Sequence, residues 1–212
     1  MKKLGIGLTA ALAMVLGMAV TASAQPNGLY FTPKIGYSHM KGKFTSDEDG
    51  SSESGSKGQF ALGLAAGYDF KSAFDVPLRA ELEYVWRGKK EVASFVEDND
   101  VKLKVGAQTF FVNAFFDIHN SSPVTPYIGG GLGLAILSAE VSIDEEGSFS
   151  KNKTNFAWNI GAGAAWKVAD NVALDFGYRY ADFGKATVTL DDESVKAKAN
   201  AHEVLLGLRF TF

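Results

Sequence analysis

The sequence predicts an all-β protein, an eight-stranded antiparallel up-and-down transmembrane β-barrel that occupies residues 25–212. The first observation is a two-residue alternation of apolar and aromatic residues with charged residues and glycines, repeated along the chain. The second is that the connections between these segments alternate between short and long. A strand places successive side chains on opposite faces, so this alternation gives each strand one apolar face and one polar face.

The clearest strand is Leu78–Arg87, in which Leu78, Leu82 and Trp86 share one face while Arg79 and Glu83 share the other. An even number of such segments, each about ten residues long, is typical of a barrel that spans the outer membrane. The expected strands are Leu29–Met40, Phe60–Phe70, Leu78–Arg87, Phe110–Ile118, Ile128–Ile136, Phe156–Val168, Val172–Tyr180 and Glu203–Phe212.

The connections predict the orientation of the barrel, because barrels of this kind have short turns in the periplasm and longer loops outside. Aromatic residues fall near both ends of the strands, so we expect two aromatic bands at the membrane interfaces. The short links are Lys71–Pro77, His119–Pro126 and Ala169–Asn171, and the long polar links are Lys41–Lys57, Gly88–Lys102, Ala139–Lys153 and Gly184–Ala199.

Residues 1–24 have the features of an export signal. Lys2 and Lys3 precede the apolar stretch Leu4–Val20, and Ala22-Ser23-Ala24 offers small residues for cleavage after Ala24. The alternative is a membrane-spanning helix, but the apolar stretch is slightly short for one and ends in the cleavage signal. We therefore expect Sec-type export.

The composition limits the classes of function. The chain has 21 basic and 24 acidic side chains, and loss of the two signal lysines makes the mature part more acidic, which disfavours nucleic-acid binding. The chain has no cysteine, so no disulfide stabilises it. A soluble β-sandwich or a lipocalin-like barrel would explain the alternation, but not aromatic faces that recur on every strand with the charges opposite.

Four parts of the chain resemble a known family. His202–Phe212 is similar to the closing strand of outer-membrane barrels, and Gln108–Asp117, Thr125–Gly133 and Gly177–Tyr180 resemble segments of the opacity proteins. The resemblance covers essentially all of the mature chain and extends to the barrel of outer-membrane protein A. Closure of a barrel removes the sheet edge that would demand a partner, so we expect a monomer. The resemblance implies a Gram-negative surface barrel in lipid and lipopolysaccharide, inserted by periplasmic chaperones and the outer-membrane assembly machinery. It also implies that Phe210 and Phe212 belong to the assembly signal.

The faces opposite the aromatic residues carry nearly balanced charges, which we expect to point into the barrel. An unpaired buried charge is costly, so the balance favours a lumen filled by ion pairs, although an ion-selective pore is the alternative. With eight strands the interior is just wide enough for side chains to fill it. The expected lumen charges are Arg79, Glu81, Glu83, Arg87, Asp117, Lys167, Asp175, Arg179, Glu203 and Arg209, with Lys34 as one more positive charge.

Acidic triplets occur in three of the long links, at Asp47–Asp49, Asp144–Glu146 and Asp191–Glu193. They could collect Ca²⁺ or Mg²⁺, but none has the spacing of an EF-hand, and a solvated loop is the simpler interpretation. The glycines of Gly129–Gly133 lack the context of a nucleotide-binding loop. We therefore predict no cofactor site and no metal site.

Some small outer-membrane barrels modify lipid A, so catalysis must be considered. The three histidines are His39, His119 and His202, and none is expected within hydrogen-bond reach of a nucleophile and an orienting acid. The predicted function is a non-enzymatic structural barrel whose exposed loops contact a host, matrix or cell surface. The alternatives are a narrow solute channel and, third, a lipid-modifying enzyme.

Overall fold

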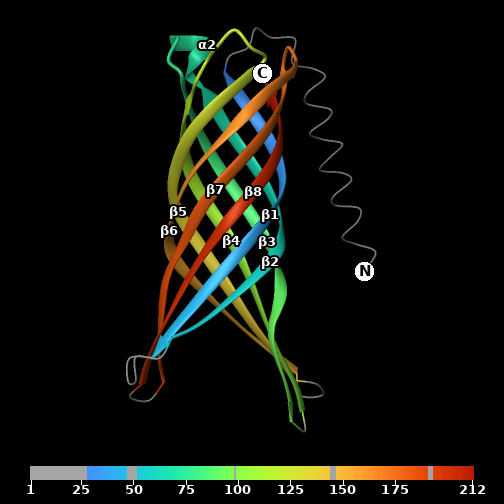
Figure 1. Ribbon diagram of the computed structural model, residues 1–212, viewed down its shortest axis with the longest axis vertical. Coiled ribbons are helices and arrows are strands. Elements are labelled where there is room, and N and C mark those ends of the chain that lie inside the picture. Colours follow the sequence, from blue (N-terminus) through green and yellow to red (C-terminus); the bar gives the residue numbers. More distant parts are fainter. Residues whose placement is uncertain (1–27, 47–51, 98, 144–146, 191–192) are drawn as a thin grey trace.

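The computed structural model describes residues 28–46, 52–97, 99–143, 147–190 and 193–212, which form a closed barrel of eight antiparallel strands (Figure 1). Each strand pairs with its neighbours in sequence, and β8 closes the barrel on β1, so the predicted fold class is confirmed. The expected signal segment, residues 1–24, lies outside the described residues. The strands are β1 Leu29–Ser46, β2 Ser52–Asp69, β3 Leu78–Glu97, β4 Asn99–Asp117, β5 Val124–Ile143, β6 Gly147–Ala169, β7 Val172–Leu190 and β8 Glu193–Thr211.

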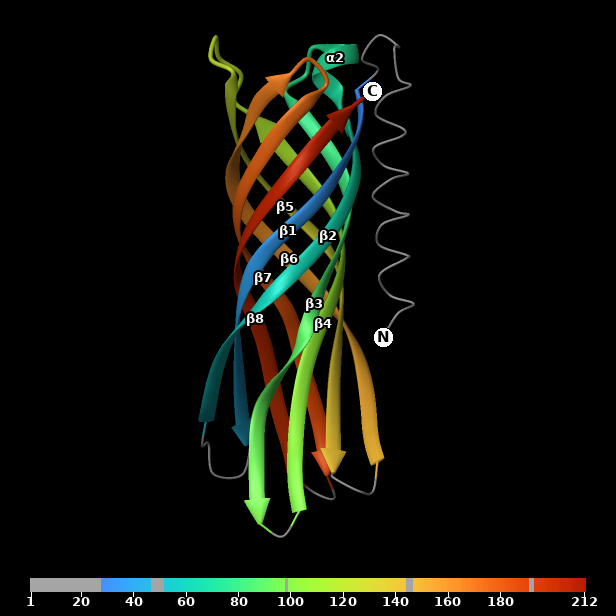
Figure 2. The ribbon, with the colours of Figure 1, turned by 90° about the vertical axis from the view of Figure 1, so that its right-hand side faces the viewer.

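β1 and β8 close the barrel in one register, which is interrupted only at Thr32 and Pro33. The register runs from Tyr30 opposite Thr211 to Ser46 opposite Val195, and the two strands lie side by side in Figure 2. Closure leaves the membrane-embedded part of the sheet without an unpaired edge. The described part of the chain contains no helix with the length and hydropathy of a transmembrane helix.

The prediction of long polar loops was wrong, because most of each long link is strand. β3 and β4 remain paired as far as Glu97 opposite Asn99, and β5 and β6 as far as Ile143 opposite Gly147. None of the four links contains a proline, so every residue can donate its backbone N–H to the ladder. The charged residues of these links led to their interpretation as loops, although residues 101–105 and 186–190 keep the two-residue alternation of a strand.

The short links lie at the opposite end of the barrel and are turns, as predicted. The longest contains α2, Phe70–Phe74, which Asp69 caps by accepting a hydrogen bond from the Lys71 backbone N–H at 2.9 Å. Asp75 ends the helix in the left-handed conformation, φ 57°. Its carboxylate pairs with the Lys71 ammonium, which holds the pKa of Asp75 below its usual value.

Towards the outer end, the barrel wall divides into two sheets. Among the described residues, the pairing of β2 with β3 ends at Ala61 opposite Arg87, and that of β6 with β7 ends at Trp158 opposite Asp182. Beyond these points β7, β8, β1 and β2 continue as one four-stranded sheet, and β3 to β6 continue as another. We call them the first arm and the second arm; they form the two legs at the bottom of Figure 1.

The wall of the barrel is apolar outside. Large side chains such as Phe60 and Leu82 are 75% and 65% exposed, which in a membrane means contact with lipid. Phe60, Trp86, Phe110 and Trp158 lie towards the arms, and Phe116 and Trp166 lie near the turns. Two aromatic residues do not fit these bands. Phe176 lies between them on β7, opposite Ala164 and Leu206, and Phe210 is only 7% exposed.

Candidate functional site

At the turn end of the lumen, one arginine is surrounded by aromatic rings. Arg79 on β3 donates from Nε to Asp117 Oδ2 on β4 at 2.6 Å, and both side chains are buried. Its guanidinium lies 4.8 Å from the centre of the Phe115 ring and 5.0 Å from that of Tyr127. Desolvation strengthens such cation–π contacts, so the rings hold the charge in place.

The second charged group at this end centres on Asp175 of β7. Its carboxylate pairs with the Arg209 guanidinium and accepts a hydrogen bond from the Tyr127 hydroxyl. Arg209 also lies 5.3 Å from the ring centre of Tyr30. This carboxylate therefore links β5, β7 and β8 across the interior.

A continuous chain of ion pairs crosses the middle of the barrel. Lys34 Nζ lies 2.6 Å from Glu81 and 2.7 Å from Glu83, and Glu83 also pairs with Arg179. Arg179 Nε in turn lies 2.8 Å from Glu203. Four strands, β1, β3, β7 and β8, are thus joined through side chains across the lumen.

The chain of ion pairs ends next to the arms, at the pair Arg87 and Glu203, which is the most deeply buried of these pairs. Glu203 accepts from Arg87 Nε at 2.6 Å and Nη2 at 2.9 Å, a two-point contact in which both side chains are fully buried. Arg87 Nη1 donates to Thr109, and the guanidinium lies 4.8 Å from the ring centre of Phe183. Alanines leave room for these large groups: Ala61, Ala107, Ala135, Ala157, Ala181 and Ala201 are all buried.

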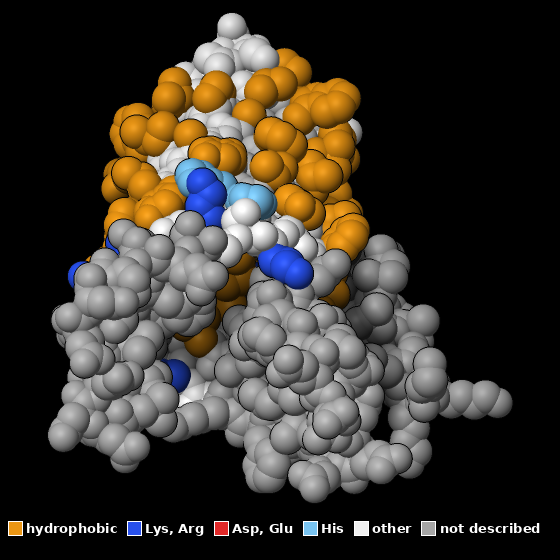
Figure 3. All heavy atoms as spheres, turned by 60° about the horizontal axis from the view of Figure 1, so that its bottom comes forward, with side chains coloured by type: hydrophobic (Ala, Val, Ile, Leu, Met, Phe, Trp, Pro, Cys, Tyr) orange, Lys and Arg blue, Asp and Glu red, His pale blue; other side chains and the backbone are white. Residues whose placement is uncertain are grey.

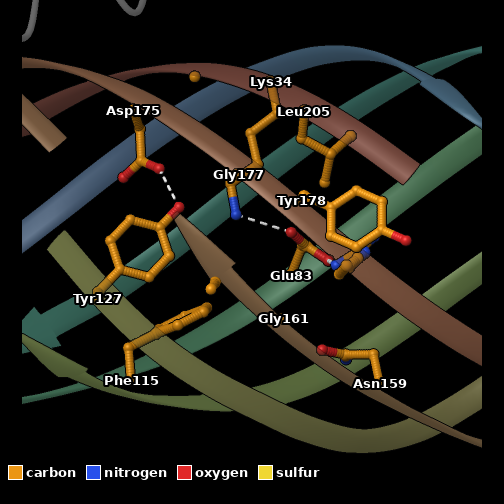
Figure 4. Close-up of a pocket in the computed structure, with 13 residues that line it drawn as sticks. Lys34, Glu83, Phe115, Tyr127, Asn159, Gly161, Asp175, Gly177, Tyr178 and Leu205 are labelled. Atoms are coloured by element: carbon orange, nitrogen blue, oxygen red, sulfur yellow. Dashed lines mark hydrogen bonds and ion pairs between the residues drawn. The ribbon is translucent and has the colours of Figure 1, made fainter. Parts of the chain in front are cut away.

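Little space remains inside. The polar cavity beside the chain of ion pairs has a volume of about 50 Å³ and is lined by Lys34, Glu83, Tyr127, Asn159 and Asp175 (Figure 4). A cavity of this size holds one or a few water molecules. The close-up shows Tyr127 reaching Asp175 and Lys34 reaching Glu83 from opposite sides, so side chains occupy the interior.

Lys167 does not join the lumen charges, contrary to expectation. Its side chain is 60% exposed and lies 3.4 Å from Asp170 in the β6–β7 turn. The register is irregular between Lys167 and Ala169, and the turn is close enough for the flexible lysine to reach water. The other nine predicted lumen charges, and Lys34, all take part in the interior contacts described above.

The sequence prediction missed the aromatic residues of the interior. Phe111 and Phe115 share the parity of Asp117 on β4, and Tyr127 shares that of Gly129 and Gly131 on β5; each of the three rings lies against an arginine. Applying the alternation to every residue type, instead of to the charges alone, would have placed them inside. The pair Asn113 and Asn159, joined at 2.9 Å, is a further inward contact of this kind.

The histidines lie apart from any catalytic arrangement. His202 lies opposite His39 in the β1–β8 register, and the Tyr178 hydroxyl contacts its Nδ1 at 2.7 Å. The neighbouring acid, Glu203, faces the lumen and is held by two arginines. His119 lies at the turn end, with Nδ1 3.2 Å from the Asp117 carbonyl oxygen. Among the described residues there is no group of three potential metal ligands of the histidine, cysteine or carboxylate type; Asp47–Asp49, Asp144–Glu146 and Asp191–Asp192 lie outside those residues.

An apolar outer wall, a charged and filled interior and closure by eight up-and-down strands define a small outer-membrane β-barrel. The sequence belongs to the outer membrane protein beta-barrel domain family, which matches residues 8–212. The protein is therefore located in the bacterial outer membrane.

Named relatives support this assignment. The chain is 32% identical to outer membrane protein PagN of Salmonella typhimurium, over 94% of this chain and 95% of that protein. It is 30% identical, over 52% of this chain and 50% of the relative, to a Rickettsia conorii protein named as a candidate adhesin, RC1281. The crystal structure of Neisserial surface protein A has the same fold, with a TM-score of 0.51 at 24% identity, over 86% of this chain and 97% of that one.

Proposed function

We propose that the protein is a surface-interaction barrel, in which a closed scaffold holds two arms outside the membrane for contact with a host, matrix or cell surface. The observation that carries the proposal is the contrast between the ion-paired lumen of the closed barrel and the strand segments that continue beyond it. The lumen is filled by ion pairs, yet β3 continues from Arg87 to Glu97 and β6 begins at Gly147, beyond the last wall contact at Trp158. The adhesin designation of one relative supports the same function.

The arms are suited to binding because their described strands are paired and extend beyond the last contacts of the closed wall. Strand residues that pairing already orders lose little conformational entropy when they bind a partner. The acidic triplets fall in the sequence links between arm strands, and a binding role for these links is part of the proposal. The barrel then needs no cofactor and no catalytic group.

The test is to shorten the second arm without disturbing the barrel. Residues 92–103 would be replaced by Asn-Gly, which joins Glu91 to Lys104, a pair that already lies opposite in the register. Cells displaying this variant should adhere less to epithelial cells or matrix than cells displaying the unaltered protein. The control replaces the periplasmic turn 119–123 by a turn of equal length.

The amounts of heat-modifiable protein in outer membranes should be equal for both variants, so that differences in adhesion report on the arm. Undiminished adhesion after shortening of both arms would contradict the proposed function. Lipid A of unchanged mass in cells with and without the gene would agree with a non-enzymatic barrel, and a changed mass would support the enzyme alternative.

The proposal includes recognition of the last strand by the assembly machinery. Phe212 ends the chain and its backbone N–H donates to the Leu29 carbonyl at 2.8 Å, next to the closing seam. Deletion of Phe212 should lower the yield of heat-modifiable protein in outer membranes far more than Phe116→Ala, which removes a lipid-facing ring near the same end. Normal assembly of the truncated protein would show that Phe212 contributes packing alone.

A further inference from the structure

The outward surface of β7, β8 and β1 changes from apolar to basic within a few residues, at the level where the apolar wall ends. The register places Tyr178 and Tyr37 beside Val204, then Tyr180 and His39 beside His202. Further out, Lys41 lies opposite Asn200 and Lys185 opposite Lys198. We call Lys41, Lys185, Lys198, His39 and His202 the basic rim. In Figure 3 the histidines lie at the edge of the orange wall, with lysine or arginine side chains beside them.

Between the apolar wall and the basic rim lie aromatic side chains, the residue type that is typical of a membrane interface. Tyr37 and Tyr178 are 52% and 49% exposed, and the Tyr180 ring lies 5.4 Å from that of His202 and 5.6 Å from that of Trp158. Barrels of this class carry aromatic residues at the headgroup level of the bilayer. The rim therefore lies at the height of lipid headgroups, above the acyl chains.

A β-bulge brings Lys185 to this face. The register shifts by one residue between Asp182 and Lys185, where Gly184 adopts φ +80° and its N–H donates to Asp182 Oδ1 at 2.9 Å. Without the extra residue, Lys185 would lie on the opposite face of the sheet from Lys198. With it, the two lysines are a directly opposed pair.

Directly opposed like charges destabilise a sheet, so this pair needs compensation. Asp182 supplies part of it, since its Oδ2 lies 3.0 Å from Lys198 Nζ. Lys185 is exposed and has no such acidic partner among the described residues, and the exposed Lys41 adds one further positive charge to this face. The described side chains of the rim therefore present a net positive surface to the headgroup layer.

We propose that the basic rim binds a phosphate group of an outer-leaflet lipid, as a phosphomonoester or phosphodiester. Lysine is a point-charge donor that suits phosphate oxygens, and the tyrosine hydroxyls and histidine nitrogens beside it can add hydrogen bonds. The lipid is favoured over phosphate in solution because the site continues directly into the apolar wall, on which acyl chains would lie. The lipid would thus neutralise the opposed lysines and hold the first arm at a fixed height.

The test measures lipid preference by electron spin resonance, with the protein in phosphatidylcholine bilayers that contain spin-labelled phosphatidic acid or spin-labelled phosphatidylcholine. The unaltered protein should restrict phosphatidic acid several-fold more strongly. In K41Q/K185Q the preference should fall towards unity, since these lysines supply most of the attraction between the rim and an anionic headgroup. The control K57Q/K153Q removes the same charge at the same end. The register partners of these lysines are the buried Met40 and the partly buried Leu137, on the inner face of the sheets.

Two further measurements complete the test. Salt that shortens the Debye length to about 3 Å should abolish the lipid preference of the unaltered protein. This measurement does not depend on the folding of any variant. Inorganic phosphate should leave the preference as it is in chloride of equal ionic strength. Equal restriction of both lipids, an unchanged preference in K41Q/K185Q, or loss of preference in K57Q/K153Q alone would overturn the proposal. Displacement by inorganic phosphate would assign the rim to phosphate in solution and overturn the lipid assignment.

Discussion

The ion pairs inside the barrel and those at its turns are made of the same chemical groups but stand in opposite environments. Arg87 and Glu203 are completely buried, whereas Lys71 and Asp75 are 40% and 86% exposed and Lys167 and Asp170 are 60% and 106% exposed. Exposed pairs contribute little because water already solvates each charge. Buried pairs are costly to form but far more costly to break, because the remaining charge has no water.

The comparison shows how the protein keeps a barrel of eight strands closed. An interior of apolar residues alone would not explain why charged groups from β1, β3, β7 and β8 meet at its centre. Each carboxylate there has at least one cationic partner, and Glu83 and Glu203 have two each. The charges therefore link β3 to β1, β7 and β8, none of which is its neighbour in the wall.

The largest expected effect comes from Glu203→Ala. The substitution leaves Arg87 and Arg179 without a shared carboxylate, and breaking such a buried arrangement typically costs about 3–5 kcal/mol. Asp170→Ala is the matched control, because it removes an acid whose partner Lys167 remains in water. Urea unfolding of the folded protein in lipid vesicles measures both. Equal midpoints for the two variants would contradict the contrast between the interior and the turns.

A smaller effect is expected from Tyr127→Phe, which removes one hydroxyl and keeps the ring beside Arg79. The hydroxyl donates to Asp175, so its loss leaves that carboxylate with one hydrogen-bond donor fewer, at a cost of about 1–3 kcal/mol. Tyr68→Phe is the control at a half-buried ring near α2. A midpoint for Tyr127→Phe no lower than that of Tyr68→Phe would show that the hydroxyl does not contribute to the lumen contacts.

The smallest effect is expected at Asp75. The Lys71 ammonium holds the pKa of this carboxyl below its usual value, so the contact is complete above that usual value and is lost as the pH falls through the lowered one. Asp75→Asn keeps a residue that tolerates the left-handed conformation and removes the charge. The variant should unfold at nearly the same urea concentration as the unaltered protein at neutral pH. A large loss would mean that the exposed pair is not screened by water.

The sequence was sufficient for the wall and for most of the lumen because both depend on the two-residue alternation. Once Leu82 faces lipid, Glu81 and Glu83 must face inward, where Lys34 pairs with both, Arg179 pairs with Glu83, and the Tyr30 hydroxyl donates to Glu81. The alternation placed Lys167 in the lumen wrongly, because this residue lies near the end of its strand, where a flexible side chain can reach water. Phe210 is a second exception. Its place in the alternation predicts an exposed outward side chain, but only 7% of it is exposed, and Phe31 and Val172 lie opposite it on the neighbouring strands.

The alternation marks the arms only in part. Lys41–Ser46 is largely polar, but residues 101–105 and 186–190 keep the two-residue alternation of apolar and polar residues, so these arm strands could have been predicted. The division of the wall at Ala61 and Arg87, and at Trp158 and Asp182, depends on which neighbours stop pairing. The end of pairing depends on how whole strands diverge, so no single segment of the sequence predicts it. The β-bulge at Gly184 is a local feature that the alternation does not predict either.

The central claim is that the barrel is a closed scaffold and that the arms act outside it, and single-channel recording in planar bilayers tests it most directly. The unaltered protein, inserted in folded form, should give no stable conductance steps, because ion-paired side chains from β1, β3, β7 and β8 cross the lumen and the cavity beside them has a volume of only about 50 Å³. Heat-modifiable migration of the same sample verifies that it is folded. Steady, ion-selective steps from the unaltered protein would contradict the account and assign the charges of the interior to a pore.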